Sequence, residues 1–526
     1  MTNLNYTPEE PIAAIATSLA PSAIGIVRTS GKNCIELISK IFSRPKALLA
    51  AKGNSLVYGW ILEPCARVPE DAVLTENSRA QAEDSALTEN SLPKAEDSAL
   101  TENSQPQNAN PRRKIDEVML GIYRSPKSFT GEDMVEIFCH GGVNVVSSVF
   151  NLLLANGFKK AQRGEYTFRA YINGKTDLTR AEAVKEIIDS KTDESRGHAA
   201  QRLSGSLFDE IDSIKKLIID TLASIEVEIE YPEDEETISD SFDISNLENA
   251  KNRLKILADS WKSEKLYQDG ARIVLCGKTN AGKSRLFNTL LKEERAIVSD
   301  IEGTTRDYLE SWVSFDGIPV RLFDTAGLRK TDDIIEEKGV ELTKDLSKEA
   351  DIILYLVDSS KGLCDEDEKF IKEQNLPLVL VFNKCDLSDF GKNSSLEQTK
   401  NQSGAKTENF ALTDEIKNKI SASVKISAKY ANGISDLIQV VKNILCKTSI
   451  SGHDQIGLGS ERQKQSVNEA LERVNHAIQT AKNSDFGLDA VVQDLEDSLD
   501  SLGEVTGEVS PEDVLSSIFA NFCVGK

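Results

Sequence analysis

Hydrophobic positions divide the chain into three kinds of segment. IAAIATSLAPSAIGIVRTSG, IDEVMLGIYRSP and DMVEIFCHGG are strand-like, and VNVVSSVFNLLLANG has the spacing of a helix that ends at a glycine. Residues 177–268, interrupted only by Pro232, and residues 461–503 have helical spacing. Between these two helical segments, short apolar runs such as ARIVLC and PLVLVF are typical of buried strands in an α/β domain.

This order predicts an α+β domain followed by a helical bundle into which an α/β domain, mostly of parallel strands, is inserted. PEDVLSSIF should begin a last helix, with Ser510 as its cap and Pro511 at the first helical position. The expected domains are residues 1–173 (α+β), 174–268 (first helical part), 269–446 (α/β) and 447–526 (second helical part).

Two polar segments interrupt this organisation. LTENS occurs three times within about residues 66–113, beginning at positions 74, 87 and 100, among Ser, Asn, Asp and Glu. With so few apolar residues the repeats cannot build a core, and we expect a disordered insertion. Residues 388–411 are a second polar insertion.

Composition excludes several classes of protein. The net charge of −23 argues against a general nucleic-acid coat, so any RNA contact requires a local basic patch or a partner. The eight cysteines form no C-x-x-C pair, which argues against a zinc site or a disulfide framework. No apolar stretch reaches the length of a membrane span, and no secretory signal precedes the first domain, so we expect a cytoplasmic protein.

A phosphate-binding motif follows the first strand of the α/β domain. GKTNAGKS, from Gly277 to Ser284, has the form G-x-x-x-x-G-K-S between a strand and a helix. Its glycines allow backbone N–H groups to converge on phosphates, Lys283 can reach the outer phosphates, and the Ser284 hydroxyl suits Mg²⁺. The segment therefore predicts a P-loop nucleotide-binding protein.

Three later segments identify the nucleotide as GTP. The strand VRLFD ends at Asp324, which can hold a Mg²⁺-bound water, and Gly327 follows with an N–H that can sense a terminal phosphate. Asn383-Lys384-Cys385-Asp386 ends another strand, and its last carboxylate can accept from guanine N1–H and N2–H₂, donors that adenine lacks. Ser427-Ala428-Lys429 fits a backbone contact to the guanine carbonyl.

Hydrolysis requires a different residue from the one that Ras-like proteins use. Leu328 occupies the position of their water-orienting Gln. Glu336, in the acidic run that follows, is a candidate, although an acid there is by spacing alone more often a solvated charge.

Several segments together resemble the MnmE (TrmE) family of GTPases that modify the wobble uridine of tRNA. They are SFTGED (128–133), GEYTFRAYINGK (164–175), DLTRAEAV (177–184), GTTRD (303–307) and FCVGK (522–526). The resemblance covers nearly the whole chain apart from the two insertions. It implies a folate-binding, dimerising N-terminal domain and a GTPase domain inserted into a helical one.

The resemblance assigns roles in the GTPase domain. It implies K⁺ ligands at Asn280, Ser299, Ile301 and Thr304, Mg²⁺ ligands at Ser284 and Thr305, and a catalytic glutamate at Glu336, with Lys283 and Asp324 also catalytic. The nucleotide-binding positions are Asn280, Ala281, Gly282, Lys283, Ser284, Arg285, Ser299, Asp300, Ile301, Glu302, Gly303, Thr304, Thr305, Asp324, Thr325, Ala326, Gly327, Asn383, Lys384, Cys385, Asp386, Ser427, Ala428 and Lys429. Ser299 stands where Thr is common.

The resemblance also implies a one-carbon site. Arg28, Glu136, Lys175 and Lys526 fall on tetrahydrofolate-binding positions, and Cys523 is expected to line the site. Arg and Lys suit the glutamate carboxylates of a folate, and Glu136 could accept from pterin N–H groups. SLAPSA (18–23) and AQRGEY (161–166) depart from the usual pattern, which affects the expected shape of the pocket.

The implied function is a K⁺- and Mg²⁺-dependent GTPase that modifies carbon 5 of wobble uridine U34. The family works as a homodimer with an FAD-dependent partner, MnmG (GidA), on tRNA, using 5,10-methylenetetrahydrofolate, of which 5-formyltetrahydrofolate is an analogue. A ribosome-assembly GTPase is the alternative, but we see no dedicated RNA-binding domain. A membrane-associated switch is disfavoured because no basic amphipathic helix is apparent.

Overall fold

A computed structural model describes residues 10–63, 113–230, 244–293, 309–324, 350–387, 414–446, 456–482 and 488–526. Nearly all of the repeat segment and all of residues 388–411 lie outside these ranges. The chain forms two compact units, Met1–Lys175 with Ser516–Lys526, and Thr176–Leu515. The sequence division placed all of residues 447–526 in the helical domain. In the structure, Ser516–Lys526 group with the first unit, where the rings of Phe168 and Phe519 pack edge to face.

The first unit is built on a six-stranded sheet of order β3-β4-β5-β2-β1-β6. The strands are β1 (Ile12–Ile15), β2 (Ser22–Ser30), β3 (Ser55–Leu62), β4 (Lys114–Tyr123), β5 (Met134–Gly141) and β6 (Lys159–Lys160). The helices α1 (Cys34–Ser39), α2 (Pro45–Ala50) and α3 (Val143–Ala155) share one core with the sheet. Tyr166 of α4 (Glu165–Ile172) packs with Ile12, Ala14 and Met134 in a second cluster. Strand alternation thus leaves one face of the sheet for the large core and the other for α4.

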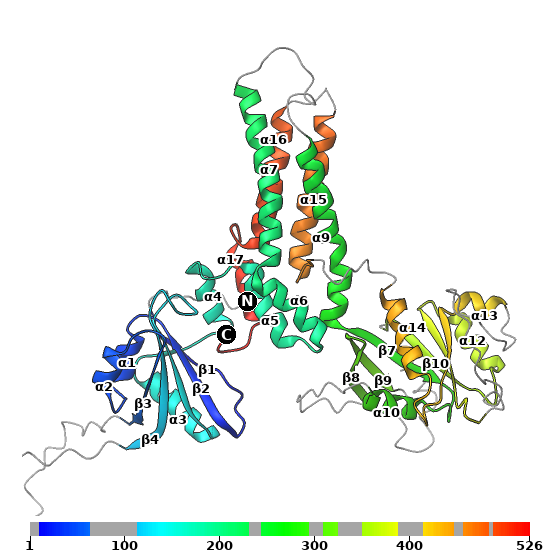
Figure 1. Ribbon diagram of the computed structural model, residues 1–526, viewed down its shortest axis with the longest axis horizontal. Helices are drawn as coiled ribbons and strands as arrows, with labels where there is room; N and C mark the ends of the chain where they lie inside the picture. The colour runs from blue at the N-terminus through cyan, green and yellow to red at the C-terminus, as the bar shows by residue number, and fades with distance from the viewer. Residues whose placement is uncertain are drawn as a thin grey trace, which may run out of the picture. The chain divides into compact units, whose positions relative to one another are not determined.

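A long helical bundle forms part of the second unit (Figure 1). Its helices are α5 (Leu178–Asp189), α6 (Asp193–Ser204), α7 (Ser206–Glu230), α9 (Ser245–Asp269), α15 (Glu461–Ala481) and α16 (Leu488–Thr506). Residues 177–268 are divided into more helices than their hydrophobic spacing predicts. The Thr192 side chain accepts from Ser195 N and starts a new helix, and Gly205, at φ +108°, ends it.

The structure corrects the prediction that Ser510 caps the last helix. α17 spans Glu512–Ala520, and the Pro511 carbonyl accepts from the N–H groups of Val514 and Leu515. Among the described residues, the buried Ser510 hydroxyl has no hydrogen-bond partner, so it does not cap the helix. No helix in the described ranges is long and apolar enough to cross a membrane.

The inserted α/β domain has a second six-stranded sheet, of order β12-β11-β10-β7-β9-β8. Its strands are β7 (Ala271–Gly277), β8 (Leu309–Phe315), β9 (Ile318–Asp324), β10 (Ile352–Asp358), β11 (Leu378–Asn383) and β12 (Ala422–Lys425), with β8 alone antiparallel to its neighbour. Apolar clusters join the sheet to α10 (Lys283–Glu293) and α14 (Ile434–Cys446), and to α12 (Asp365–Glu373) and α13 (Asp414–Lys419). Because the parallel strands end at one edge, Gly277, Asp324 and Asn383 all lie there.

Candidate functional site

The loop between β7 and α10 requires its glycines. Gly277 and Gly282 have φ of +130° and +102°. A Cβ on Gly277 would lie 2.3 Å from the Leu356 carbonyl oxygen, and one on Gly282 would lie 2.2 Å from Asn383 Nδ2. Asn280, also in the left-handed region at φ +63°, is exposed at the outside of the loop. The loop backbone can therefore turn sharply only because side chains are absent at these two positions.

Lys283 lies across this loop. Its Nζ donates to the carbonyl oxygens of Gly277 at 2.7 Å and Lys278 at 3.0 Å, and the residue is only 7% exposed. Ser284 and Arg285 follow on the exposed side of the first turn of α10. The ammonium group and the N-terminus of α10 thus lie together, an arrangement that favours an anion.

Asp324 lies at the same sheet edge. It is fully buried at the end of β9 and is in register with Leu275 of β7, two residues before Gly277. A carboxylate placed next to the phosphate loop is positioned for a Mg²⁺-bound water.

The segments expected to bind the base are joined by Asn383. Its Nδ2 donates to the Ala281 carbonyl at 2.8 Å, and its Oδ1 accepts from Ala428 N at 3.0 Å. The Ser427 hydroxyl donates to Asp386 Oδ1 at 2.6 Å. These contacts hold the Asp386 carboxylate in one orientation beside the Ser427–Lys429 segment.

Lys384 and Cys385 support this arrangement from within the protein. Lys384 is at φ +64°, and its Nζ lies 2.8 Å from Asp358 Oδ2 at the end of β10. Burial opposes ionisation of Asp358, but hydrogen bonds from Lys384 and Ser360 outweigh burial and lower its pKa to about 2. Cys385 N donates to the Ile426 carbonyl at 3.2 Å. The ammonium of Lys429 lies 4.8 Å from the Tyr430 ring centroid.

The remaining nucleotide-site candidates lie outside the described residues. They are Ser299, Asp300, Ile301, Glu302, Gly303, Thr304, Thr305, Thr325, Ala326, Gly327 and Glu336.

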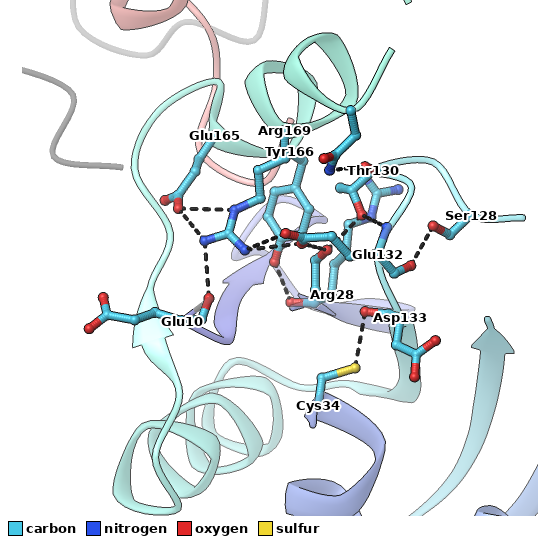
Figure 2. A network of polar contacts seen from close by, with 12 residues as sticks. Glu10, Arg28, Cys34, Ser128, Thr130, Glu132, Asp133, Glu165, Tyr166 and Arg169 are labelled. Carbon is cyan, nitrogen blue, oxygen red and sulfur yellow. Dashed lines mark hydrogen bonds and ion pairs between the residues drawn. The ribbon is translucent and has the colours of Figure 1, made fainter. Parts of the chain in front are cut away.

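A second polar site lies in the first unit, on the sheet face covered by α4 (Figure 2). Arg28 of β2 and Glu136 of β5 are directly paired in the sheet, and their side chains form an ion pair at 2.9 Å. Arg28 also donates to the Gly525 carbonyl at 3.1 Å. The structure therefore brings Arg28 and Glu136 together with the chain terminus.

Aromatic residues that the sequence reasoning missed surround this pair. The rings of Phe129 and Tyr166 lie 5.9 and 5.7 Å from the Arg28 guanidinium carbon. Burial and the neighbouring Glu136 carboxylate raise the pKa of Tyr123. Phe129 and Tyr166 belong to SFTGED and GEYTFRAYINGK, but spacing along the chain contains no sign that they meet at one arginine.

The other folate candidates are placed less centrally. Lys175 is exposed and donates from Nζ to the Pro126 carbonyl at 3.0 Å. Lys526 contributes a main-chain oxygen, which accepts from Tyr166 N at 3.2 Å. Cys523 is exposed, and its carbonyl accepts from Gly164 N at 3.4 Å.

The fold and these sites define a P-loop GTPase domain inserted in a helical domain and preceded by an α+β domain. The family model "GTP-binding protein TrmE N-terminus" matches residues 11–93 and 75–175, and "MnmE helical domain" matches residues 178–523. The tRNA modification GTPase MnmE of Treponema denticola is 46% identical over 528 residues, covering 99% of each chain. The proteins of the same name from Treponema pallidum (strain Nichols) and Borrelia turicatae are 39% identical, covering 99% of each chain, and 36% identical, covering 100% of each. The chain therefore belongs to the MnmE family of tRNA modification GTPases.

Proposed function

We propose that this chain is a K⁺-dependent GTPase that acts with a flavoprotein on the wobble uridine U34 of certain tRNAs. The product carries a carboxymethylaminomethyl or aminomethyl group at C5, built with a tetrahydrofolate one-carbon unit. The proposal rests on the presence of two sites in one chain of this family. At one, the Asn383–Ala281 hydrogen bond joins the segments expected to bind the nucleotide. At the other, the Arg28–Glu136 ion pair meets the Gly525 carbonyl of the terminal segment.

Recognition of GTP rests on Asp386 and the phosphate loop. Asp386 accepts the two guanine N–H donors, and Lys283 neutralises charge on the outer phosphates. Ser284, exposed at the start of α10, together with Thr305 would hold Mg²⁺, which supplies charge neutralisation between the phosphates. Asp324 would hold a water of that ion.

The K⁺ site and the catalytic base complete this proposal. The exposed amide of Asn280, on a left-handed turn of the phosphate loop, is a hard oxygen donor of the kind an alkali cation binds. Asn280 would hold K⁺ with Ser299, Ile301 and Thr304, and the ion would supply positive charge to the transition state. Glu336 would orient the attacking water, since Leu328 cannot.

The folate site rests on Arg28 and Glu136. Both side chains are partly accessible, at 20% and 16% exposure, so a ligand can reach them. Glu136 would accept from pterin N–H groups, while Arg28, Lys175 and Lys526 would attract folate carboxylates. Cys523 is exposed on the docked terminus and would lie near the one-carbon group.

A homodimer through the first unit is supported by exposed apolar residues at one sheet edge. Leu56 and Tyr58 of the edge strand β3 are 62% and 51% exposed, and Met119 of β4, paired with Tyr58, is 45% exposed. An apolar edge of this kind favours association with another chain.

Wobble-nucleoside analysis of tRNA tests the proposal. Cells lacking this chain should lose the modified uridine, and the full chain should restore it. A chain ending at Phe522 should fail to restore it while keeping K⁺-stimulated GTP hydrolysis. An unchanged level of modified wobble uridine in the deletion strain would contradict the proposal. If that strain instead had a defect in ribosomal subunits, a ribosome-assembly GTPase would be favoured.

A further inference from the structure

Arg169 of α4 is a fully buried cation between two carboxylates. It is 1% exposed, and its guanidinium donates to Glu165 Oε1 at 2.8 Å and Glu132 Oε2 at 3.0 Å (Figure 2). It also donates to the Glu10 carbonyl at 3.1 Å. Burial opposes its charge, yet the carboxylates raise its pKa above the ordinary value. A planar guanidinium suits this geometry because its five N–H donors spread in a fixed fork.

The Glu132 end of this cluster anchors the loop between β4 and β5. Glu132 Oε2 also accepts from the Ser30 hydroxyl at 2.7 Å, and Ser30 Oγ lies 2.7 Å from Thr130 Oγ1. The same loop carries Phe129, whose ring lies 5.9 Å from the Arg28 guanidinium carbon. Moving Glu132 would therefore move an aromatic wall of the Arg28 site.

Glu165 lies one turn before Arg169 on the same helix, α4, and orients the guanidinium there. α4 is also the helix that receives the chain terminus. Tyr166, the residue after Glu165, donates from its hydroxyl to the Arg28 carbonyl at 2.7 Å and from its N–H to a main-chain oxygen of Lys526 at 3.2 Å. Its ring is the second aromatic group near the Arg28 guanidinium. Arg169 thus connects the Phe129 loop to the Tyr166 helix, two of the three segments that, among the described residues, contact Arg28 from outside the sheet. The third is the terminal segment, through the Gly525 carbonyl.

We propose that Arg169 is a positioning residue for the Arg28 site, fixing the Phe129 loop relative to the Tyr166 helix and thereby docking the terminus. The proposal rests on the proposed folate function of that site. Arg169 acts through its neighbours, because a side chain with 1% exposure does not reach a ligand. Buried ion pairs often add little net stability over apolar residues of similar volume, whereas they do specify one arrangement in some proteins.

Three variants test the proposal. Arg169→Lys keeps the charge but cannot span both carboxylates, and Glu132→Gln keeps the shape while removing one charge. Thr29→Val is the matched control, because it removes a buried hydrogen bond to the Val135 carbonyl on the opposite face of β2. Each variant is measured in the full chain for 5-formyltetrahydrofolate affinity, for release of the terminal lysine by a basic carboxypeptidase, for melting temperature and for GTPase rate.

Arg169→Lys and Glu132→Gln should each weaken 5-formyltetrahydrofolate binding at least about tenfold and speed release of Lys526 several-fold. Thr29→Val should change neither, even at an equally lowered melting temperature, and the GTPase rate should stay within about twofold throughout. Normal folate affinity together with normal Lys526 release in Glu132→Gln would overturn the positioning role. It would also be overturned if folate affinity fell in all three variants in proportion to their melting temperatures. If the unmodified chain binds no folate, the proposed folate function fails, and the release rates alone decide the role of Arg169.

Discussion

The side-chain amide of Asn383 donates a 2.8 Å hydrogen bond to the carbonyl of Ala281, in the phosphate loop. The same amide accepts from Ala428 N at 3.0 Å, in the segment expected to meet the guanine. With 2% exposure, Asn383 has no access to solvent water that could replace these bonds. One side chain therefore holds the phosphate and base segments in a fixed relation.

Replacing Asn383 should weaken GTP binding through the segments that this side chain holds together. Asn383→Ala leaves the buried Ala281 carbonyl and Ala428 N–H unsatisfied, and we expect a loss of about 2 kcal/mol in binding, roughly 30-fold in Kd. Gln439→Ala, on an exposed face of α14, is the control and should bind GTP normally. Titration with a fluorescent GTP analogue measures both, and equal affinities in the two variants would contradict the bridging role.

Nucleotide choice should rest on Asp386. The Ser427 hydroxyl already orients its Oδ1 at 2.6 Å, so Asp386→Asn changes the chemistry of the group more than its position. We expect GTP to bind about 2–3 kcal/mol more weakly, the scale of a lost charged hydrogen bond, and xanthosine triphosphate to bind relatively better. Competition between the two nucleotides is the measurement, and an equal loss for both would show that the carboxylate does not read the base.

Turnover should depend on K⁺ and on Glu336. Replacing K⁺ by Na⁺, or Glu336 by Ala, should slow GTP hydrolysis while leaving nucleotide affinity nearly intact, because both act mainly in the transition state. Steady-state hydrolysis and equilibrium binding, measured on the same preparations, separate the two effects. If Glu336→Ala hydrolyses GTP at the normal rate in K⁺, another residue orients the attacking water.

A buried cluster in the helical bundle predicts a pH dependence of stability. Arg202 of α6 donates to Glu186 Oε2 at 2.6 Å and to Glu264 Oε2 at 2.7 Å, and His198 Nδ1 lies 2.8 Å from Glu264 Oε1. Burial raises the pKa of Glu186 to about 7, against the opposing effect of Arg202, and the acids Glu182 and Glu264 add to the rise. The folded state therefore holds a proton that the unfolded chain releases near its ordinary pKa.

Because the pKa of Glu186 is higher in the folded state than in the unfolded chain, the free energy of unfolding falls as pH rises. The contribution of Glu186 is fully present below about pH 4.5 and is lost as pH rises to about 7, up to roughly 3 kcal/mol. Glu186→Gln, which cannot ionise, should be more stable than the unmodified chain at pH 8 and nearly equal to it at pH 4.5. Denaturant unfolding at both pH values decides it, and a constant difference between the two proteins would exclude Glu186 as the source.

Local patterns in the sequence predicted the elements and the motifs they carry. Consecutive apolar runs predicted β7 and β11, and the glycines of GKTNAGKS predicted a loop whose left-handed φ values the structure contains at Gly277 and Gly282. Such features depend on a residue and its near neighbours, which is why they can be recognised without the fold. The resemblance to the MnmE family rested on motifs of the same kind, and the family matches confirm it.

Only the tertiary structure decided which distant residues meet. Arg28 and Gly525 are 497 positions apart, yet they share a hydrogen bond because strand register and the docked terminus bring them together. The Arg169 cluster and the Asn383 bridge likewise join segments whose spacing along the chain contains no sign of contact. Register and docking are set by the packing of whole sheets and helices, so no window of sequence contains them.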